Sequence, residues 1–289
     1  MIQYIHIGYP KSASTWLQRT FFPAFPERIN LLYKSLTKPI LYNDLDYSRQ
    51  AVLNMAKPLV RAAMTNVYSD EILSGWTEKA NFSRTCDRLK ELFPDAKVLI
   101  VLRNQNDFLL SYYKFYISRG YGFSEHRFLN RYCHGENIYR FLEYEHLLGY
   151  CKQLFDEVHV ELFERLILEH KMRDLLGFFG LEDEPMDPAA LTAKSVNASP
   201  GTAQAIALSR YVNRHFGTYA QLFDNYNCMT RWNTKIRPAF ERTLTALSLA
   251  RKYTFKEKHV EQIQERFRES NARLQAHFDY DIAPYGYVK

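Results

Sequence analysis

Residues 97–102 read Lys-Val-Leu-Ile-Val-Leu, and this almost unbroken apolar run constrains the fold more than any other segment. A strand of this kind is buried on both faces, as in the middle of a parallel sheet. Four more strand-like runs are separated, for the most part, by helix-like stretches, at 2–7, 29–33, 66–68 and 158–163. The alternation predicts an α/β fold in which helices flank a central parallel sheet.

The last third of the chain has a different pattern. Strand-like runs stop at about residue 202, and segments 203–223 and 255–278 have the periodicity of amphipathic helices. The length of 289 residues suits one large domain. We therefore predict a single domain over 1–289, with an α/β core in 1–200 and a helical extension in 201–289 that packs on the core.

The charge of the chain indicates an anionic partner. A net charge of +6 and a pI near 9.0 suit a nucleotide, an anionic glycan, nucleic acid or a lipid surface, and do not choose among them. The four cysteines stand far apart without a CxxC pair, at positions 86, 133, 151 and 228. This spacing favours buried thiols over a zinc site or a disulfide framework, and predicts no metal.

The ends of the chain and its apolar runs bear on localisation. The first residues form a strand-like run and lack the basic and apolar regions of an export signal. No apolar stretch reaches the roughly 20 residues that cross a bilayer. We expect a cytoplasmic protein without a membrane span. Its positive net charge is compatible with peripheral contact with a membrane surface. The sequence predicts no oligomeric state.

Residues 5–17 read Ile-His-Ile-Gly-Tyr-Pro-Lys-Ser-Ala-Ser-Thr-Trp-Leu, a strand followed by a tight loop and a helix start. Such a turn directs backbone amides and the positive end of a helix at one point, where an anion binds. Lys11 adds a charge, and Ser14 and Thr15 add hydroxyl donors. The segment is no Walker A motif, because that motif needs Gly-Lys directly before its hydroxyl residue. A plain strand-to-helix turn with a capping serine would give a similar pattern.

A second candidate site follows the central strand. Arg103 stands at the end of that strand and Ser111 comes eight residues later, early in an expected helix. The carboxyl ends of parallel strands form the ligand-binding edge of open α/β sheets, so both side chains could hold one anion. The alternative is that Arg103 pairs with a local acid while Ser111 caps or packs.

The two segments together resemble the sulfotransferases that use 3′-phosphoadenosine 5′-phosphosulfate (PAPS). The first resembles the family's 5′-phosphosulfate loop, written PK-[ST]-G-[ST]-T, with Ala13 in place of the usual glycine. Arg103 and Ser111 match the family's 3′-phosphate pattern R-[ND]-P-x-[DE]-x-x-x-S, with Gln105 in place of proline. Weaker similarities follow in the order found in bacterial sulfotransferases. The resemblance implies a P-loop-NTPase-like sulfotransferase fold with PAPS as cosubstrate.

The resemblance also implies which residues bind the donor. Lys11 would stabilise the leaving oxygen, while loop amides and hydroxyls would hold the phosphate and sulfate oxygens. The Trp16 ring would stack on adenine or fill the core. Asn197 lies in a stretch that resembles a segment near the nucleotide, or in an ordinary loop. The complete predicted donor set is Pro10, Lys11, Ser12, Ala13, Ser14, Thr15, Trp16, Arg103, Ser111 and Asn197.

The acceptor must lose a proton, and the base is less defined. Glu71 follows the strand at 66–68, which brings it to the same sheet edge as the loop. In the glycan and tyrosylprotein branches of the family, a glutamate is the base, so Glu71 is the candidate. His6 and Asp70 are alternatives, and Glu71 could instead be a solvated residue.

We therefore predict an enzyme that moves a sulfuryl group from PAPS to a hydroxyl or amine. The acceptor is unidentified, and glycans, lipid-linked sugars and small metabolites all fit. Two other hypotheses stay open: a non-catalytic nucleotide- or nucleic-acid-binding protein, and a degenerate sulfotransferase that binds nucleotide without turnover. We expect no nucleic-acid partner, because no RNA- or DNA-reading motif is present.

Overall fold

A computed structural model describes residues 1–75, 81–185, 187, 189, 191, 201–222 and 236–287, and for 216–222 the backbone alone. Its chain divides into two compact units. The sheet unit comprises Met1–Asn104, Tyr139–Val196 and Phe267–Lys289, and the helical unit comprises Gln105–Ile138 and Asn197–Arg266. Each unit contains segments from both sides of the boundary predicted at residue 200. That the chain forms one domain, with a helical extension packed on the core, stays a prediction.

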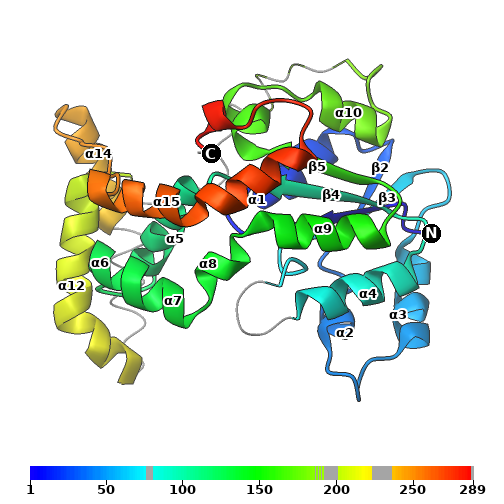
Figure 1. Cartoon of the computed structure of the whole chain (residues 1–289), viewed down its shortest axis with the longest axis horizontal. Coiled ribbons are helices and arrows are strands. Elements are labelled where there is room, and N and C mark those ends of the chain that lie inside the picture. The colour runs from blue at the N-terminus through cyan, green and yellow to red at the C-terminus, as the bar shows by residue number, and fades with distance from the viewer. Residues whose placement is uncertain are drawn as a thin grey trace. The chain divides into compact units, whose positions relative to one another are not determined.

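Five parallel strands form the centre of the sheet unit (Figure 1). Their order in the sheet is β2-β3-β1-β4-β5. Their bounds are β1 Tyr4–Ile7, β2 Ile29–Tyr33, β3 Thr65–Asp70, β4 Lys97–Leu102 and β5 Val158–Leu162. The predicted α/β fold with a central parallel sheet is confirmed, and the apolar run at 97–102 is a central strand that pairs with β1 and β5.

Helical segments cover the sheet. The chain after β1 is helical from Ser14 to Ala24, as helix α1 (Ser14–Trp16), π-helix η1 (Leu17–Phe21) and 3-10 helix η2 (Phe22–Ala24). Among its described residues, this unit also contains the helical elements α2 (Thr37–Leu41), α3 (Arg49–Ala56), η3 (Lys57–Leu59), α4 (Phe82–Leu92), α9 (Tyr144–Leu154), η6 (Glu164–Leu168), α10 (Arg173–Phe179), η8 (Gln275–His277) and η9 (Ala283–Tyr285).

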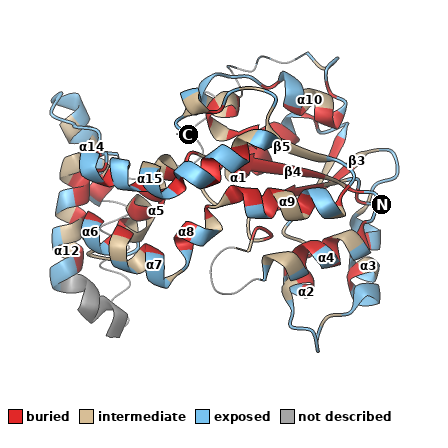
Figure 2. Cartoon of the chain, in the orientation of Figure 1, coloured by how far each residue is buried: buried red, intermediate tan, exposed pale blue. Residues whose placement is uncertain are grey.

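Side chains alternate between the two faces of the sheet. On one face, Leu99 and Val101 of β4 and Val67 of β3 pack with the aromatic residues of segment 16–25 and with α10. The opposite face is covered by α4 and α9, which pack against each other. Figure 2 shows the strands buried and the outer sides of these helices exposed. The free thiols Cys86 and Cys151 are buried between α4 and α9, with 3.8 Å between their sulfur atoms.

The strand order fixes where a ligand can bind. After β1 the chain moves to the β2 edge, returns through β3, and then crosses to β4 on the other side of β1. The loops after β1 and β4 therefore leave the sheet next to each other and in opposite directions. In open α/β sheets this point is a crevice for ligands.

The helical unit contains the helices α5 (Gln105–Ser118), α6 (Glu125–Arg127), η5 (Phe128–Tyr132), α7 (Cys133–Gly135), α12 (Ala203–Leu222) and α14 (Arg237–Ala246). Helix α15 (Glu257–Leu274) and helix α8 (Ile138–Phe141) each contribute residues to both units. Helices α12 and α15 confirm the two amphipathic helices expected from the sequence.

Buried polar contacts hold the helical unit together. The Glu125 carboxylate accepts hydrogen bonds from the Tyr253 hydroxyl at 2.7 Å and the Lys256 amide at 3.3 Å, and lies 2.8 Å from His259 Nδ1. The Asn213 amide donates to the carbonyl oxygens of Ile117 and Tyr121. These contacts join α12 and α15 to the segments around α5 and α6, since each carboxylate or amide bridges two parts of the chain.

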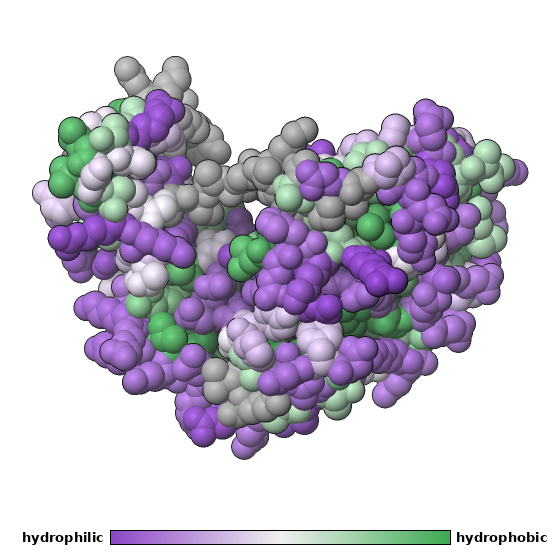
Figure 3. Space-filling model, turned by 90° about the horizontal axis from the view of Figure 1, so that it is seen from above, coloured by the Kyte–Doolittle hydropathy of each residue, from purple (hydrophilic) through white to green (hydrophobic). Residues whose placement is uncertain are grey.

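One face of the molecule is mostly polar. The face shown in Figure 3 is predominantly hydrophilic, with hydrophobic side chains in small separate groups. Within the described ranges, no helix is both long enough and apolar enough to cross a bilayer.

Candidate active site at the end of the central strands

The loop after β1 is tightly packed and conformationally restricted. Gly8 is required there, because an added Cβ would lie 2.6 Å from Ser14 Oγ and 2.8 Å from Glu71 Cα. Ala13 is the N-cap of α1 and has the left-handed conformation, with φ 61° and ψ 4°. Lys11 also has a positive φ of 64°. Glycine tolerates this region and other residues are strained in it, so Ala13 carries strain where related loops have glycine.

Several loop side chains contact the protein itself. The Ser14 hydroxyl donates to the Tyr9 carbonyl at 3.1 Å, and Tyr9 is buried against Tyr144. Ser12 is fully buried, and its Oγ has no hydrogen-bond partner in the described part of the chain. The Trp16 ring lies in the core, and its Nε1 donates to the Leu191 carbonyl at 3.0 Å. A donor contact at Trp16 would therefore use its backbone amide, whose place at the start of the helix suits an anion.

Arg103 lies beside this loop. Its Nη1 donates to the Lys11 carbonyl at 2.9 Å, and its guanidinium stacks 4.4 Å from the centre of the Phe163 ring. The Tyr144 hydroxyl holds the Arg103 carbonyl at 2.7 Å. No ion pair involves Arg103 among the residues that the structure describes, and its Nε is buried without a partner there. The alternative that Arg103 pairs with a local acid receives no support from these contacts.

Two predicted donor residues do not belong to the described part of the sheet unit. Ser111 is in the second turn of α5, which begins at Gln105, so it lies early in a helix as expected. It belongs to the helical unit, so its pairing with Arg103 of the sheet unit stays a prediction. Asn197 lies outside the described residues. Pro10 and Thr15 are half-buried members of the loop region.

Glu71 lies directly after β3, beside the loop. Its Oε1 is 2.5 Å from Lys34 Nζ, and its Oε2 is 3.4 Å from Gln18 Nε2. Burial raises the pKa of Glu71, but the hydrogen bond and charge of Lys34 outweigh it, so the pKa lies below its ordinary value. The Glu71 side chain is 28% exposed. It is therefore an ionised carboxylate that a solute can reach.

His6 and Asp70 are both inaccessible, each with an exposure of 0%. Burial lowers the pKa of His6 to about 4, and its Nδ1 lies 2.8 Å from Ser69 Oγ. Asp70 accepts hydrogen bonds from the Thr37 hydroxyl and from the Ile72 amide. Burial raises the pKa of Asp70. Of the three candidates for the base, only Glu71 meets solvent.

Sequence reasoning missed Lys34 and Gln18. Lys34 directly follows β2, and the carboxyl ends of β2 and β3 meet at the same sheet edge. That position is the signal that could have identified Lys34 as a partner of Glu71. Gln18 lies in the helical segment after the loop and donates to Ser69 Oγ at 3.1 Å. The described residues contain no group of three or more His, Cys, Asp or Glu side chains that could hold a metal ion.

Comparisons with known proteins identify the family and support the fold. The family model "Sulfotransferase domain" matches residues 2–200. The structure is similar to the crystal structure of a sulfotransferase from Alicyclobacillus acidocaldarius, with a TM-score of 0.55, 15% sequence identity and coverage of 99% of both chains.

A sulfotransferase domain from the curacin biosynthetic pathway aligns over 72% of this chain and 83% of that chain, with 18% identity and a TM-score of 0.39. No curated protein sequence matches the chain. The family match covers more than half of the residues, including the strand, loop and helix that position Lys11 and the strand that positions Arg103. The chain belongs to the sulfotransferase domain family.

Proposed function

We propose that the protein transfers a sulfuryl group from PAPS to a hydroxyl or amine of an acceptor. The observation that carries the proposal is the contact between Arg103 and the Lys11 segment, at the point where the loops after β1 and β4 diverge. A guanidinium without a carboxylate partner in the described chain suits a phosphate group, which it can bind through two parallel hydrogen bonds. Ser12 Oγ and Arg103 Nε, both buried without partners there, are further donors for such a ligand.

The proposed donor site uses the loop and Arg103 at its two ends. The backbone amides at the start of α1, with Lys11, Ser12, Ser14 and Thr15, would hold the 5′-phosphosulfate. Arg103 would hold the 3′-phosphate together with Ser111, and Asn197 would contribute nearby. Pro10, Ala13 and Trp16 would shape the loop, since two of its residues already have positive φ.

In the proposed reaction, the acceptor oxygen or nitrogen attacks sulfur as the bond from sulfur to the bridging oxygen breaks. Negative charge accumulates on that leaving oxygen, where Lys11 would stabilise it. The proton of the acceptor would pass to Glu71. Support for this role comes from the exposure and ionised state of Glu71 and from the burial of His6 and Asp70. Glycans, lipid-linked sugars and small metabolites remain candidate acceptors.

Calorimetric titration with 3′-phosphoadenosine 5′-phosphate tests the donor site. We expect Arg103→Ala to weaken binding by about tenfold or more, the value of a charge-assisted hydrogen bond. The same substitution should weaken the binding of adenosine 5′-phosphate less, because that nucleotide lacks the 3′-phosphate and loses only the support that Arg103 gives to the Lys11 carbonyl. Arg173→Ala, at an exposed position on α10, is the matched control. Equal affinity of the wild type for both nucleotides would count against a PAPS site.

A second function, nucleotide binding without turnover, is favoured by one observation. The Lys34 ion pair lowers the proton affinity of Glu71 and so weakens it as a base. Transfer assays with labelled PAPS and a cell extract separate the two functions. The transferase predicts labelled product with the wild type and little with Glu71→Gln, at unchanged donor affinity. Full activity of Glu71→Gln would remove Glu71 from the mechanism.

A further inference from the structure

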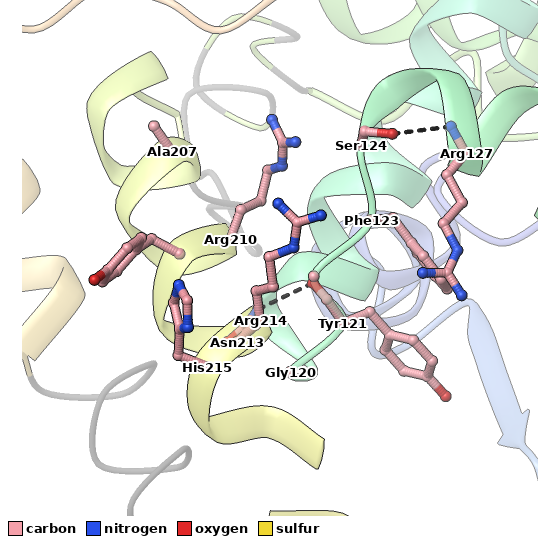
Figure 4. Close-up of a pocket in the computed structure, with 12 residues that line it drawn as sticks. Gly120, Tyr121, Phe123, Ser124, Arg127, Ala207, Arg210, Asn213, Arg214 and His215 are labelled. Atoms are coloured by element: carbon pink, nitrogen blue, oxygen red, sulfur yellow. Dashed lines mark hydrogen bonds between the residues drawn. The ribbon is translucent and has the colours of Figure 1, made fainter.

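The helical unit contains a pocket of about 760 Å³, and none of the predicted donor residues that the structure describes lines it. It lies between α12 and the segment 120–124 that follows α5 (Figure 4). Pockets of this size hold a whole small molecule rather than a single ion. The lining residues are Gly120, Tyr121, Gly122, Phe123, Ser124, Arg127, Ala207, Arg210, Tyr211, Asn213, Arg214 and His215.

Three arginines line the pocket, and no acidic residue of the described chain does. Arg210 and Arg214 extend side by side from one face of α12, whereas the Arg127 side chain from α6 lies beside Phe123, apart from the other two (Figure 4). No ion pair with any of the three arginines occurs among the described residues. The Nε of Arg210 is buried without a partner in that part of the chain. Two like charges at positions i and i+4 repel each other, so an anion between them would relieve a cost.

The wall opposite α12 is held in place. The Asn213 amide donates to the carbonyl oxygens of Ile117 at 2.7 Å and of Tyr121 at 3.1 Å. Gly122 passes so close to α12 that an added Cβ would lie 3.2 Å from the backbone of Arg214. The Arg127 guanidinium lies 5.5 Å from the centre of the Phe123 ring. The pocket is therefore preformed, which lowers the entropy lost on binding.

The chemistry of the pocket selects an oxyanion on an organic molecule. Guanidinium groups bind phosphate, sulfate and carboxylate, and the tyrosine and phenylalanine side chains at the same pocket offer apolar contact for the rest of a ligand. We propose that this pocket binds a small organic molecule that carries a phosphate, sulfate or carboxylate group.

Calorimetry on the full chain tests the pocket, with inorganic pyrophosphate as the probe and the donor site saturated with 3′-phosphoadenosine 5′-phosphate. We expect pyrophosphate to bind the saturated wild type. The double variant Arg210→Gln, Arg214→Gln should bind it about 100-fold more weakly, from about tenfold for each lost charge-assisted contact. The control Arg242→Gln, Arg251→Gln removes the same charge from exposed positions of the helical unit and should bind as the wild type does.

Two results would overturn the proposal. One is equal pyrophosphate affinity in the pocket variant and its control. The other is weaker binding of 3′-phosphoadenosine 5′-phosphate by the pocket variant, which would assign the pocket to the donor. If that variant does not fold, phenylglyoxal modification of the wild type serves instead. Pyrophosphate should slow modification of Arg210 and Arg214, measured by peptide mass spectrometry, and leave Arg242 unaffected, whereas unprotected pocket arginines contradict the site.

Discussion

Replacing Ala13 by glycine should stabilise the sheet unit. Ala13 has φ 61°, a left-handed conformation that costs a residue with a side chain about 1–2 kcal/mol. Glycine removes this strain but adds freedom to the unfolded chain, which costs about 0.4–1 kcal/mol. The difference predicts that Ala13→Gly raises the free energy of unfolding by about 1 kcal/mol. Overlap with neighbours cannot arise, since the substitution only removes a methyl group.

Gly180 provides a matched control of opposite sign. It ends helix α10 with φ 64°, almost the same value as Ala13, and an added Cβ would meet no atom within 4 Å. Gly180→Ala should therefore lower the free energy of unfolding by about 1 kcal/mol, through backbone strain alone. Both positions lie in the sheet unit, so one unfolding transition reports on both.

Urea denaturation, followed by fluorescence and circular dichroism, measures the two changes. The slope of the free energy against urea should stay constant, because neither substitution alters the surface exposed on unfolding. A destabilised Ala13→Gly variant beside a destabilised Gly180→Ala variant would refute the reasoning. It would show that the methyl group of Ala13 contributes packing that exceeds the strain of its backbone.

Three further outcomes follow from the contacts around the loop. Lys34→Met should raise the pKa of Glu71, because the effect of burial is then no longer opposed by the lysine charge. The acid limb of the pH profile of kcat/KM should move to higher pH, and an unchanged limb would contradict Glu71 as the base. Lys11→Ala should lower kcat far more than it weakens acceptor binding, measured in steady-state assays, whereas unchanged turnover would exclude Lys11 from the reaction. Burial lowers the pKa of His6 from 6.5 to about 4. As the pH falls, His6 therefore takes up its proton at a higher pH in the unfolded chain than in the folded one. About 3 kcal/mol of the free energy of unfolding should be lost between pH 6.5 and pH 4. His6→Leu should lack this loss in denaturation series at several pH values, and equal acid sensitivity of both proteins would show that His6 is not its source.

The sheet could be predicted from the sequence to within a few residues. Strands β2 and β4 have the predicted bounds, because each is mostly apolar, with only Asn30 in β2 and Lys97 at the start of β4 as polar residues. Strand β3 extends to Asp70, two residues beyond the predicted end. Its last residues, Ser69 and Asp70, resemble a turn in the sequence but are fully buried and hydrogen-bonded in the structure. Strand prediction depends on a pattern of apolar residues, and these two positions are polar. They can be buried in a strand because each has a hydrogen-bond partner there.

The site was predictable where one segment carries it and not where distant segments meet. The loop around Lys11 combines strand, turn and helix start in one run of sequence. The ion pair between Lys34 and Glu71 joins two loops 37 positions apart. The local sequence of neither loop indicates that it contacts the other. The arginine pocket likewise depends on α12 and the segment 120–124, which no periodicity brings together. Tertiary placement decides these contacts, and local pattern does not contain it.

The hydrogen bond between the Asn104 side chain and the Gly286 carbonyl has a consequence for synthesis and folding. Asn104 follows Arg103, and its partner lies 182 positions later. A nascent chain that already contains both loops of the proposed donor site still lacks the segment Phe267–Lys289, which belongs to the same unit. Contacts of such long sequence separation form slowly, because a large loop must close first. The segment that follows β4 therefore acquires this anchor only after Gly286 has emerged.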